Sequence, residues 1–502
     1  MVPLESAGVS DVAPRVVSHR GVEEACVTEG WRAERAPVPD GTRRLLAGWL
    51  ALAIGSLVLA GIFAILVAFT RTPAVQLLRS PNAFHLSLVA HVTFGFTVWF
   101  VTFAGALWIY AAWRANYSLN AHLSWAGLAL ATTGTIAMAV PAFTLQGRPY
   151  LNDYVPVIDH PLFWVGLAAT GVGVTLQALA YLAARWVARR GSLADGGPAP
   201  RELPESLGMA IAAVAMLLTL TTVLVTAARL EPAVPFGYRL RVLFWGGGHL
   251  LQYLHVAAMA SVWFVCSAPA VVGARVPAPR AQRLLLSAMV PFMIAVAGAY
   301  LVWRPEELLV THLVTILTFG GLGAISVPIA MNVAAGMGKA GVRPWGNPLF
   351  SSTMLSFALF AIGGVMGLIG FHQDTRVPAH YHGMVGAVTL AYMGIGPVLL
   401  NLTGRQQWSE RLARWQPSLY ALGLLGLMVG MHWAGGHGAP RKTFGFTWAN
   451  AQALVALNLM GIGSLLAIAG GIAFIVNMGL PFLHRTSTVG GRSWSSEHIL
   501  SH

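Results

Sequence analysis

Residues 372–382 read His-Gln-Asp-Thr-Arg-Val-Pro-Ala-His-Tyr-His and lead into a long apolar run over residues 379–402. A run of this length predicts a helix inside a membrane, with His380 and His382 at its start. Residues two apart on a helix point about 200° apart, so these imidazoles cannot ligate the same metal. Imidazole is a good axial ligand for iron. The segment therefore predicts one helix with ligands for two haems; the alternative is two histidines that cap the helix beside Asp374 and Arg376.

Apolar runs of similar length recur along the whole chain. The 502 residues are 56% hydrophobic and only 10% charged, a composition that excludes an ordinary soluble protein. A lipid-exposed span must satisfy its own backbone hydrogen bonds, so each run is expected to be a helix. The sequence thus predicts an all-α polytopic membrane protein with twelve transmembrane helices, over residues 45–69, 83–112, 122–145, 161–184, 207–228, 241–271, 283–303, 308–333, 350–371, 379–402, 417–433 and 449–480.

Twelve spans leave both ends of the chain on the same side of the membrane. That side carries 21 of the 31 Lys and Arg residues, against 10 on the other, so the positive-inside rule predicts cytoplasmic termini. We expect a mobile cytoplasmic extension over residues 1–44, a haem-binding membrane domain over 45–480 and a cytoplasmic tail over 481–502. The net charge of +13 follows from the loops and from contact with the anionic lipid bilayer, so no nucleic-acid partner is expected.

The chain offers histidine rather than cysteine for binding a metal. Cys26, in the extension, and Cys266, inside a span, cannot form a disulfide framework or a thiolate metal cluster. A single histidine in a span is more often a packing residue than a ligand. With a rise of about 1.5 Å per residue, however, several histidines fall within the outer third of the bilayer. These candidate metal ligands are His91, His249, His312, His380 and His382.

The histidine segments resemble subunit I of the haem-copper oxidases, the family that includes the cytochrome c and quinol oxidases and the nitric oxide reductases. Residues 372–382 are similar to the family's His-Asp-Thr…Ala-His-Phe-His stretch, and residues 90–96, Ala-His-Val-Thr-Phe-Gly-Phe, to its span 2 element. The resemblance implies that His380 binds a high-spin haem and that His91 and His382 together bind a low-spin haem. Two axial histidines close an iron to substrate, so the low-spin haem is expected to relay electrons.

Residues 438–442, Gly-Ala-Pro-Arg-Lys, resemble the family's Pro-Arg-Arg turn before span 12, in which two cations hold haem propionates. The resemblance implies this cofactor-binding role for Arg441 and Lys442. Propionates at the membrane edge need fixed positive partners, and here Lys offers a point charge in place of the planar fork of Arg.

Residues 248–253 in span 6, Gly-His-Leu-Leu-Gln-Tyr, resemble the family's Gly-His-Pro-Glu-Val-Tyr element. In the oxygen-reducing members this histidine binds copper, and the tyrosine is joined to it and supplies an electron and a proton to oxygen. The resemblance implies catalytic roles for His249 and Tyr253. Their spacing of four residues suits contact on one helix face, which also allows the alternative that they are only core neighbours.

The chain departs from the family in span 7. Where the family has two adjacent histidine ligands to copper, residues 302–307 read Val-Trp-Arg-Pro-Glu-Glu. His312 is the nearest replacement in depth, and His255 and Glu306 are further candidates. A carboxylate ligand would favour non-haem iron over copper. We expect a second metal, if bound, to be held by His249 and His312 with a third ligand that the sequence leaves open.

The function that the sequence favours is a terminal oxidase in a bacterial-type inner membrane. Electrons from a cytochrome c or quinol donor are expected to pass through the two haems, with O2 reduced to water. Companion oxidase subunits are expected, because the chain has no Cys-x-x-Cys-His motif for a c-type haem. Leu251 replaces the family's span 6 glutamate and residues 319–324 contain no lysine, so little proton pumping is expected. The alternatives are a nitric oxide reductase, a non-catalytic haem protein for electron transfer or gas sensing, and a transporter without haem.

Overall fold

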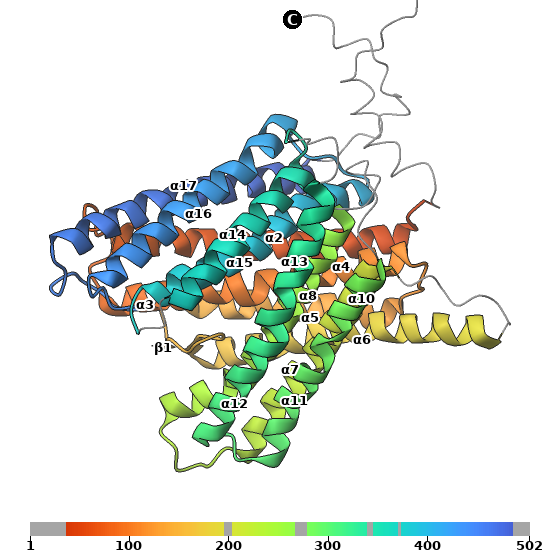
Figure 1. Ribbon diagram of the computed structural model, residues 1–502, viewed down its shortest axis with the longest axis horizontal. Helices are drawn as coiled ribbons and strands as arrows, with labels where there is room; N and C mark the ends of the chain where they lie inside the picture. The colour runs from red at the N-terminus through yellow and green to blue at the C-terminus, as the bar shows by residue number, and fades with distance from the viewer. Residues whose placement is uncertain (1–36, 195–202, 267–278, 339–344, 370–372, 485–502) are drawn as a thin grey trace, which may run out of the picture.

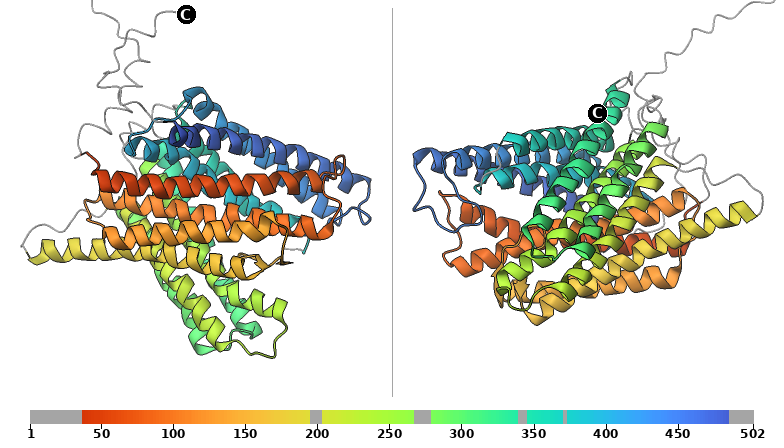
Figure 2. Two further views of the ribbon diagram at one scale, coloured as in Figure 1. Left: turned by 180° about the vertical axis from the view of Figure 1, so that it is seen from behind. Right: turned by 60° about the horizontal axis from the view of Figure 1, so that its bottom comes forward.

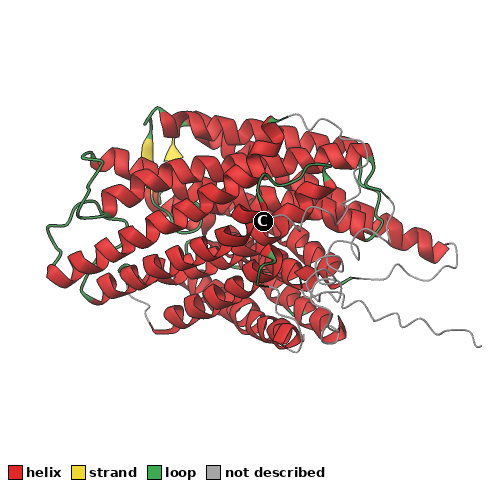
Figure 3. Cartoon of the chain, turned by 90° about the horizontal axis from the view of Figure 1, so that it is seen from above, coloured by secondary structure: helices red, strands yellow, loops and turns green. Residues whose placement is uncertain are grey.

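The computed structural model describes residues 37–194, 203–266, 279–338, 345–369 and 373–484, which are mostly helical (Figure 3). Within this part of the chain, twelve helices are long and apolar enough to cross a membrane, which confirms the predicted fold class. Residues 1–36 and 485–502, and with them most of the predicted extension and tail, Cys26 and His372 lie outside the described residues. The spans are α2 (Asp40–Arg71), α3–η1–α4 (Pro81–Val92, Thr93–Val98, Trp99–Arg114), α5 (Ala121–Phe143), α6 (Pro161–Ala194), α7 (Pro204–Arg229), α8 (Phe236–Cys266), α10–α11 (Pro279–Ser287, Met289–Val302), α12–η2–α13 (Leu308–Thr318, Phe319–Gly323, Ala324–Gly338), α14 (Pro348–Ile369), α15 (Arg376–Leu402), α16 (Glu410–Gly436) and α17 (Ala451–Leu483).

Consecutive spans pack as antiparallel pairs. α5 packs on α6, α7 on α8, α14 on α15 and α16 on α17 (Figures 1 and 2). Glycines allow the close approach: a Cβ atom at Gly127 or Gly173, or at Gly134 or Gly166, would run into the backbone of the opposite helix. In lipid there is little hydrophobic drive between helices, so this close packing is what stabilises each pair.

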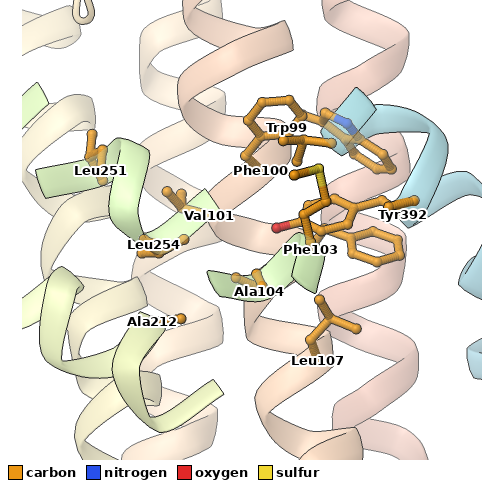
Figure 4. Close-up of a cluster of buried hydrophobic side chains, with 14 of the residues drawn as sticks. Trp99, Phe100, Val101, Phe103, Ala104, Leu107, Ala212, Leu251, Leu254 and Tyr392 are labelled. Carbon is orange, nitrogen blue, oxygen red and sulfur yellow. The ribbon is translucent and has the colours of Figure 1, made fainter. Parts of the chain in front are cut away.

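The spans that carry most of the predicted ligands are also the most enclosed. In the most apolar stretch of each span, 94% of the residues are buried in α8, 83% in α3–α4 and 78% in α15, but only 28% in α12–α13. Figure 4 shows side chains of α4 packed around Tyr392 of α15, whose ring stacks on that of Phe103 with the centroids 4.4 Å apart. Three of the spans that carry predicted ligands, α3–α4, α8 and α15, are therefore the most enclosed spans of the bundle.

Two local features were not predicted from the sequence. In the connection between α5 and α6, β1 (Arg148–Tyr150) pairs antiparallel with β2 (Val157–Asp159), with Pro149 opposite Ile158. In addition, π-helical turns interrupt two spans, η1 directly after α3 and η2 directly after α12. Such turns often occur at functional sites, and η1 begins two residues after His91. The hairpin fixes the ends of the turn over residues 151–156, which contributes to the site below.

Candidate functional site

His91 and His382 lie on different spans, but their imidazoles are anchored in the same way. His91 Nδ1 is 3.1 Å from the Ala60 carbonyl oxygen on α2, and His382 Nδ1 is 2.6 Å from that of Pro378. A carbonyl oxygen only accepts, so each Nδ1 donates its hydrogen and each Nε2 keeps a lone pair. No described residue hydrogen-bonds either Nε2 atom, and the two rings are close enough for their charges to interact. Both Nε2 atoms would therefore be available to ligate a haem iron.

His380 is seated against α14. Its Nδ1 atom is 2.7 Å from the carbonyl oxygen of Gly363. A Cβ atom at Gly367 would run into the His380 ring, and one at Gly363 would run into the backbone of α15. These two glycines, about one turn apart, let α14 approach closely enough to orient the imidazole, as an axial ligand requires.

The loop after α16 is fastened to the start of α15. Thr375 donates its backbone N–H to the Ala439 carbonyl oxygen at 3.0 Å and its hydroxyl to that of Met431 at 2.7 Å. Residues 441–442 follow directly in this loop. They are therefore held beside the end of α15 that carries the His-x-His pair.

Arg441 and Lys442 meet Asp153, for which the sequence analysis had no role. Lys442 Nζ is 2.8 Å from Asp153 Oδ1 and 2.7 Å from the Leu151 carbonyl oxygen, and Arg441 Nη1 is 3.4 Å from Asp153 Oδ1. Burial would raise the pKa of Asp153, but Lys442, Arg441 and Arg241 hold it below its usual value. Burial lowers the pKa of Lys442, and the attraction of Asp153 only partly offsets this effect. Among the described residues, three cations share this one carboxylate, so the cluster keeps an excess positive charge that fits a haem propionate.

His249, on α8, has both ring nitrogens in hydrogen bonds. Nδ1 is 2.7 Å from the Trp245 carbonyl oxygen, and Nε2 is 3.0 Å from the hydroxyl oxygen of Tyr154. The rings of Tyr154 and His249 have their centroids 4.6 Å apart. A metal bound to His249 would have to displace one of these two partners, so the residues present do not fit the family's second metal.

Sequence reasoning missed Tyr154, whose loop carries no motif. The sequence did contain a signal on α8, the helix that Tyr154 contacts. Glycines inside an apolar helix often mark a close approach of another segment. In the structure, a Cβ atom at Gly248 would run into the Tyr154 side chain, and one at Gly246 would run into Tyr300. The run of glycines over residues 246–248 therefore makes room for aromatic side chains on both sides of α8.

Tyr253 is fully buried one turn beyond His249. Its hydroxyl donates to the Leu317 carbonyl oxygen on α12 at 3.0 Å, and a Cβ atom at Gly321 would run into that hydroxyl. The phenol is thus directed at α12 and η2. The side chain that hydrogen-bonds His249 is Tyr154 rather than Tyr253.

The structure does not bring His312 to His249. Val310, Val314 and Thr318 are the buried residues of α12, whereas the His312 side chain is exposed. His312 is two positions from both Val310 and Val314, so it lies on the opposite face of α12. Its predicted depth in the membrane does not reveal which face of the helix it occupies. Across the described ranges there is no group of three or more His, Cys, Asp or Glu side chains that could hold a metal ion.

The two other candidate ligands are equally outside any such group. Glu306 lies in the connection between α11 and α12, where its carbonyl oxygen accepts from the Tyr238 hydroxyl at 3.4 Å. His255 is buried against the rings of Phe96 and Phe100, with centroids 5.3 and 4.9 Å away. Neither residue completes a metal site around His249 within the described part of the chain.

Comparison with known proteins gives concordant matches. Residues 44–472 match the family model described as Cytochrome C and Quinol oxidase polypeptide I. Cytochrome c oxidase subunit 1 of Thermus thermophilus is 28% identical over 441 residues, which cover 80% of this chain and 76% of that protein. An uncharacterised protein of Rickettsia prowazekii is 22% identical over 506 residues, which cover 86% of this chain and 94% of that protein. The solved structure of a heme-copper terminal oxidase dimer shares the fold, with a TM-score of 0.73, 18% identity, and coverage of 89% of this chain and 85% of that one.

Proposed function

Because this chain belongs to the cytochrome c and quinol oxidase polypeptide I family, we propose that it is the haem-bearing subunit of a membrane oxidase. In this proposal His91 and His382 hold a low-spin haem that receives electrons from a cytochrome c or quinol donor. His380 would hold a high-spin haem, which would supply the binding site for O2, and the proposed reaction is the reduction of O2 to water. The shared anchoring of His91 and His382 is the observation that carries the proposal, because it leaves two Nε2 atoms as lone-pair donors on α3 and α15.

The bound haems supply the electron transfer and the gas binding, and the residues of this chain supply the surroundings. Arg441 and Lys442 attract the propionates. Tyr253 is the proposed proton donor, at the hydroxyl that is bonded to the Leu317 carbonyl oxygen. Leu251 is buried at the position where the family has a glutamate, so we propose that protons arrive from the outer side and that few or none are pumped.

We place the protein in a bacterial-type inner membrane with both termini in the cytoplasm, as the distribution of basic residues favours. Companion subunits are part of the proposal, because the sequence contains no Cys-x-x-Cys-His motif for a c-type haem that could receive electrons from a donor.

A second candidate is a haem protein without gas-reducing activity, used for electron transfer or gas sensing. The engagement of both His249 nitrogens favours it, because it leaves no free nitrogen there for copper or non-haem iron.

Nitric oxide reduction has one supporting observation, a buried Glu306 carboxylate oxygen without a hydrogen-bond partner among the described residues.

The test is an optical spectrum and a metal analysis of the purified protein, followed by O2 and nitric oxide consumption with a reduced donor. The proposal expects two haems per chain and O2 consumption. Two haems without consumption of either gas would favour the second candidate. A preparation that binds no haem would refute both.

A further inference from the structure

Tyr154 has an unusual backbone conformation. Its φ angle is +68°, in the left-handed region that a bulky residue rarely adopts. This conformation directs its ring onto α8 at Gly248, where any side chain would collide with it. Strained backbone of this kind persists only where the surroundings enforce it, and it is concentrated at functional sites.

The residues directly before Tyr154 are held by the ion pairs of Asp153. Lys442 Nζ bonds both the Asp153 carboxylate and the Leu151 carbonyl oxygen, so one ammonium group clamps the turn on the N-terminal side of Tyr154. A lysine suits this double contact because its ammonium group has three freely placed donors, whereas guanidinium donors are fixed in a plane. The lysine that departs from the family's Pro-Arg-Arg turn therefore has a specific partner in this chain.

The direction of the Tyr154–His249 hydrogen bond follows from the groups around it. The Trp245 carbonyl oxygen can only accept, so Nδ1 of His249 carries the hydrogen and Nε2 of the neutral ring is an acceptor. The Tyr154 hydroxyl must therefore donate to Nε2. The side chain of Gln252 also hydrogen-bonds to the Tyr154 hydroxyl.

From this geometry we propose that the Tyr154–His249 pair takes the place of a second metal and forms the polar wall that faces a diatomic ligand on the His380 haem. Lys442 and Asp153 act as positioning residues for Tyr154. The inference rests on the proposed function for the presence of that haem, and adds which groups of the protein meet the gas.

The experiment uses the full-length purified protein, with carbon monoxide as the probe. Metal analysis should find iron equal to the haem content and no stoichiometric copper. In Tyr154→Phe, the stretching band of bound CO should shift and CO should escape at a rate changed by roughly fivefold, the factor that one neutral hydrogen bond represents. Gly248→Ala should give a similar shift, because it displaces the phenol while leaving Tyr154 and His249 chemically intact.

Tyr150→Phe is the matched control, since Tyr150 belongs to the same hairpin and packs its ring on Phe236 instead. Its CO band should be that of the wild type, and all variants must first show the wild-type haem content. Stoichiometric copper or non-haem iron in the wild type would overturn the proposal. So would CO bands in Tyr154→Phe and Gly248→Ala that match Tyr150→Phe. A wild type without haem would instead remove the proposed function on which this inference depends.

Discussion

Two regions of the molecule share one local arrangement of histidine: the haem-ligand region around α3 and α15, and the region around His249 on α8. In both, a histidine on a highly enclosed span gives its Nδ1 hydrogen to a backbone carbonyl oxygen. They differ at the other nitrogen: no described residue bonds Nε2 of His91 or His382, whereas Tyr154 bonds that of His249. A backbone carbonyl oxygen, on the histidine's own helix or on a neighbouring one, therefore orients each ring, and a neighbouring loop decides whether it can bind a metal.

The largest effect should come from removing a ligand of the low-spin haem. His91→Ala and His382→Ala should each abolish the sharp α-band of a reduced six-coordinate haem, because iron loses an axial imidazole. An optical spectrum of the reduced protein measures this. His312→Ala is the control, since this exposed histidine should leave the spectrum unchanged. A low-spin spectrum that survives in His91→Ala would show that His91 is not a ligand of the low-spin haem.

A smaller but selective effect is expected from Gly367→Ala on α14. The added methyl group runs into the His380 ring, and overpacking of this kind costs about 1–3 kcal/mol. The high-spin haem signal should fall while the low-spin signal remains, as resolved by low-temperature spectra. Gly364→Ala, where the methyl group meets nothing within 4 Å, should keep both signals. Equal losses in the two variants would point to a general effect on α14.

Neutralising Arg441 should change the reduction potential of a haem without removing a haem ligand. Arg441→Gln removes a cation that favours the reduced haem over the oxidised one, so a reduction potential should fall by on the order of tens of millivolts. Potentiometric titration measures the change. Arg405→Gln, in the loop between α15 and α16, is the control because its side chain packs on Phe482. Unchanged potentials for both haems in Arg441→Gln would place this loop away from the propionates.

The smallest effect concerns pH. The pKa of Asp153 is depressed in the folded protein, so its ion pairs stabilise the fold fully above the unfolded value of about 4 and lose this contribution as the pH falls through the folded value. Asp153→Asn should lower stability by at most about 1 kcal/mol at pH 7, with the difference from wild type shrinking only below about pH 4. Thermal unfolding between pH 3 and pH 8 tests this. A difference that disappears already near pH 6 would contradict the assigned ion pair.

The sequence by itself determined the twelve spans and the candidate haem ligands. A membrane span must satisfy its backbone internally, which makes long apolar runs unambiguous, and the spacing of His380 and His382 fixes their opposite directions on one helix. What the sequence could not determine was which face of α12 is buried, and hence that His312 points away from the bundle.

Only the tertiary structure decided the partners of His249 and Lys442. Tyr154 lies 95 residues before His249, and Asp153 lies 289 residues before Lys442. The hydrophobic periodicity of a sequence describes each helix relative to its own axis. It therefore cannot predict that a loop contacts a helix far away in the sequence. The glycine at position 248, the left-handed backbone of Tyr154 and the ammonium group of Lys442 produce the contact together, because close packing at one point depends on the shape of three separate segments.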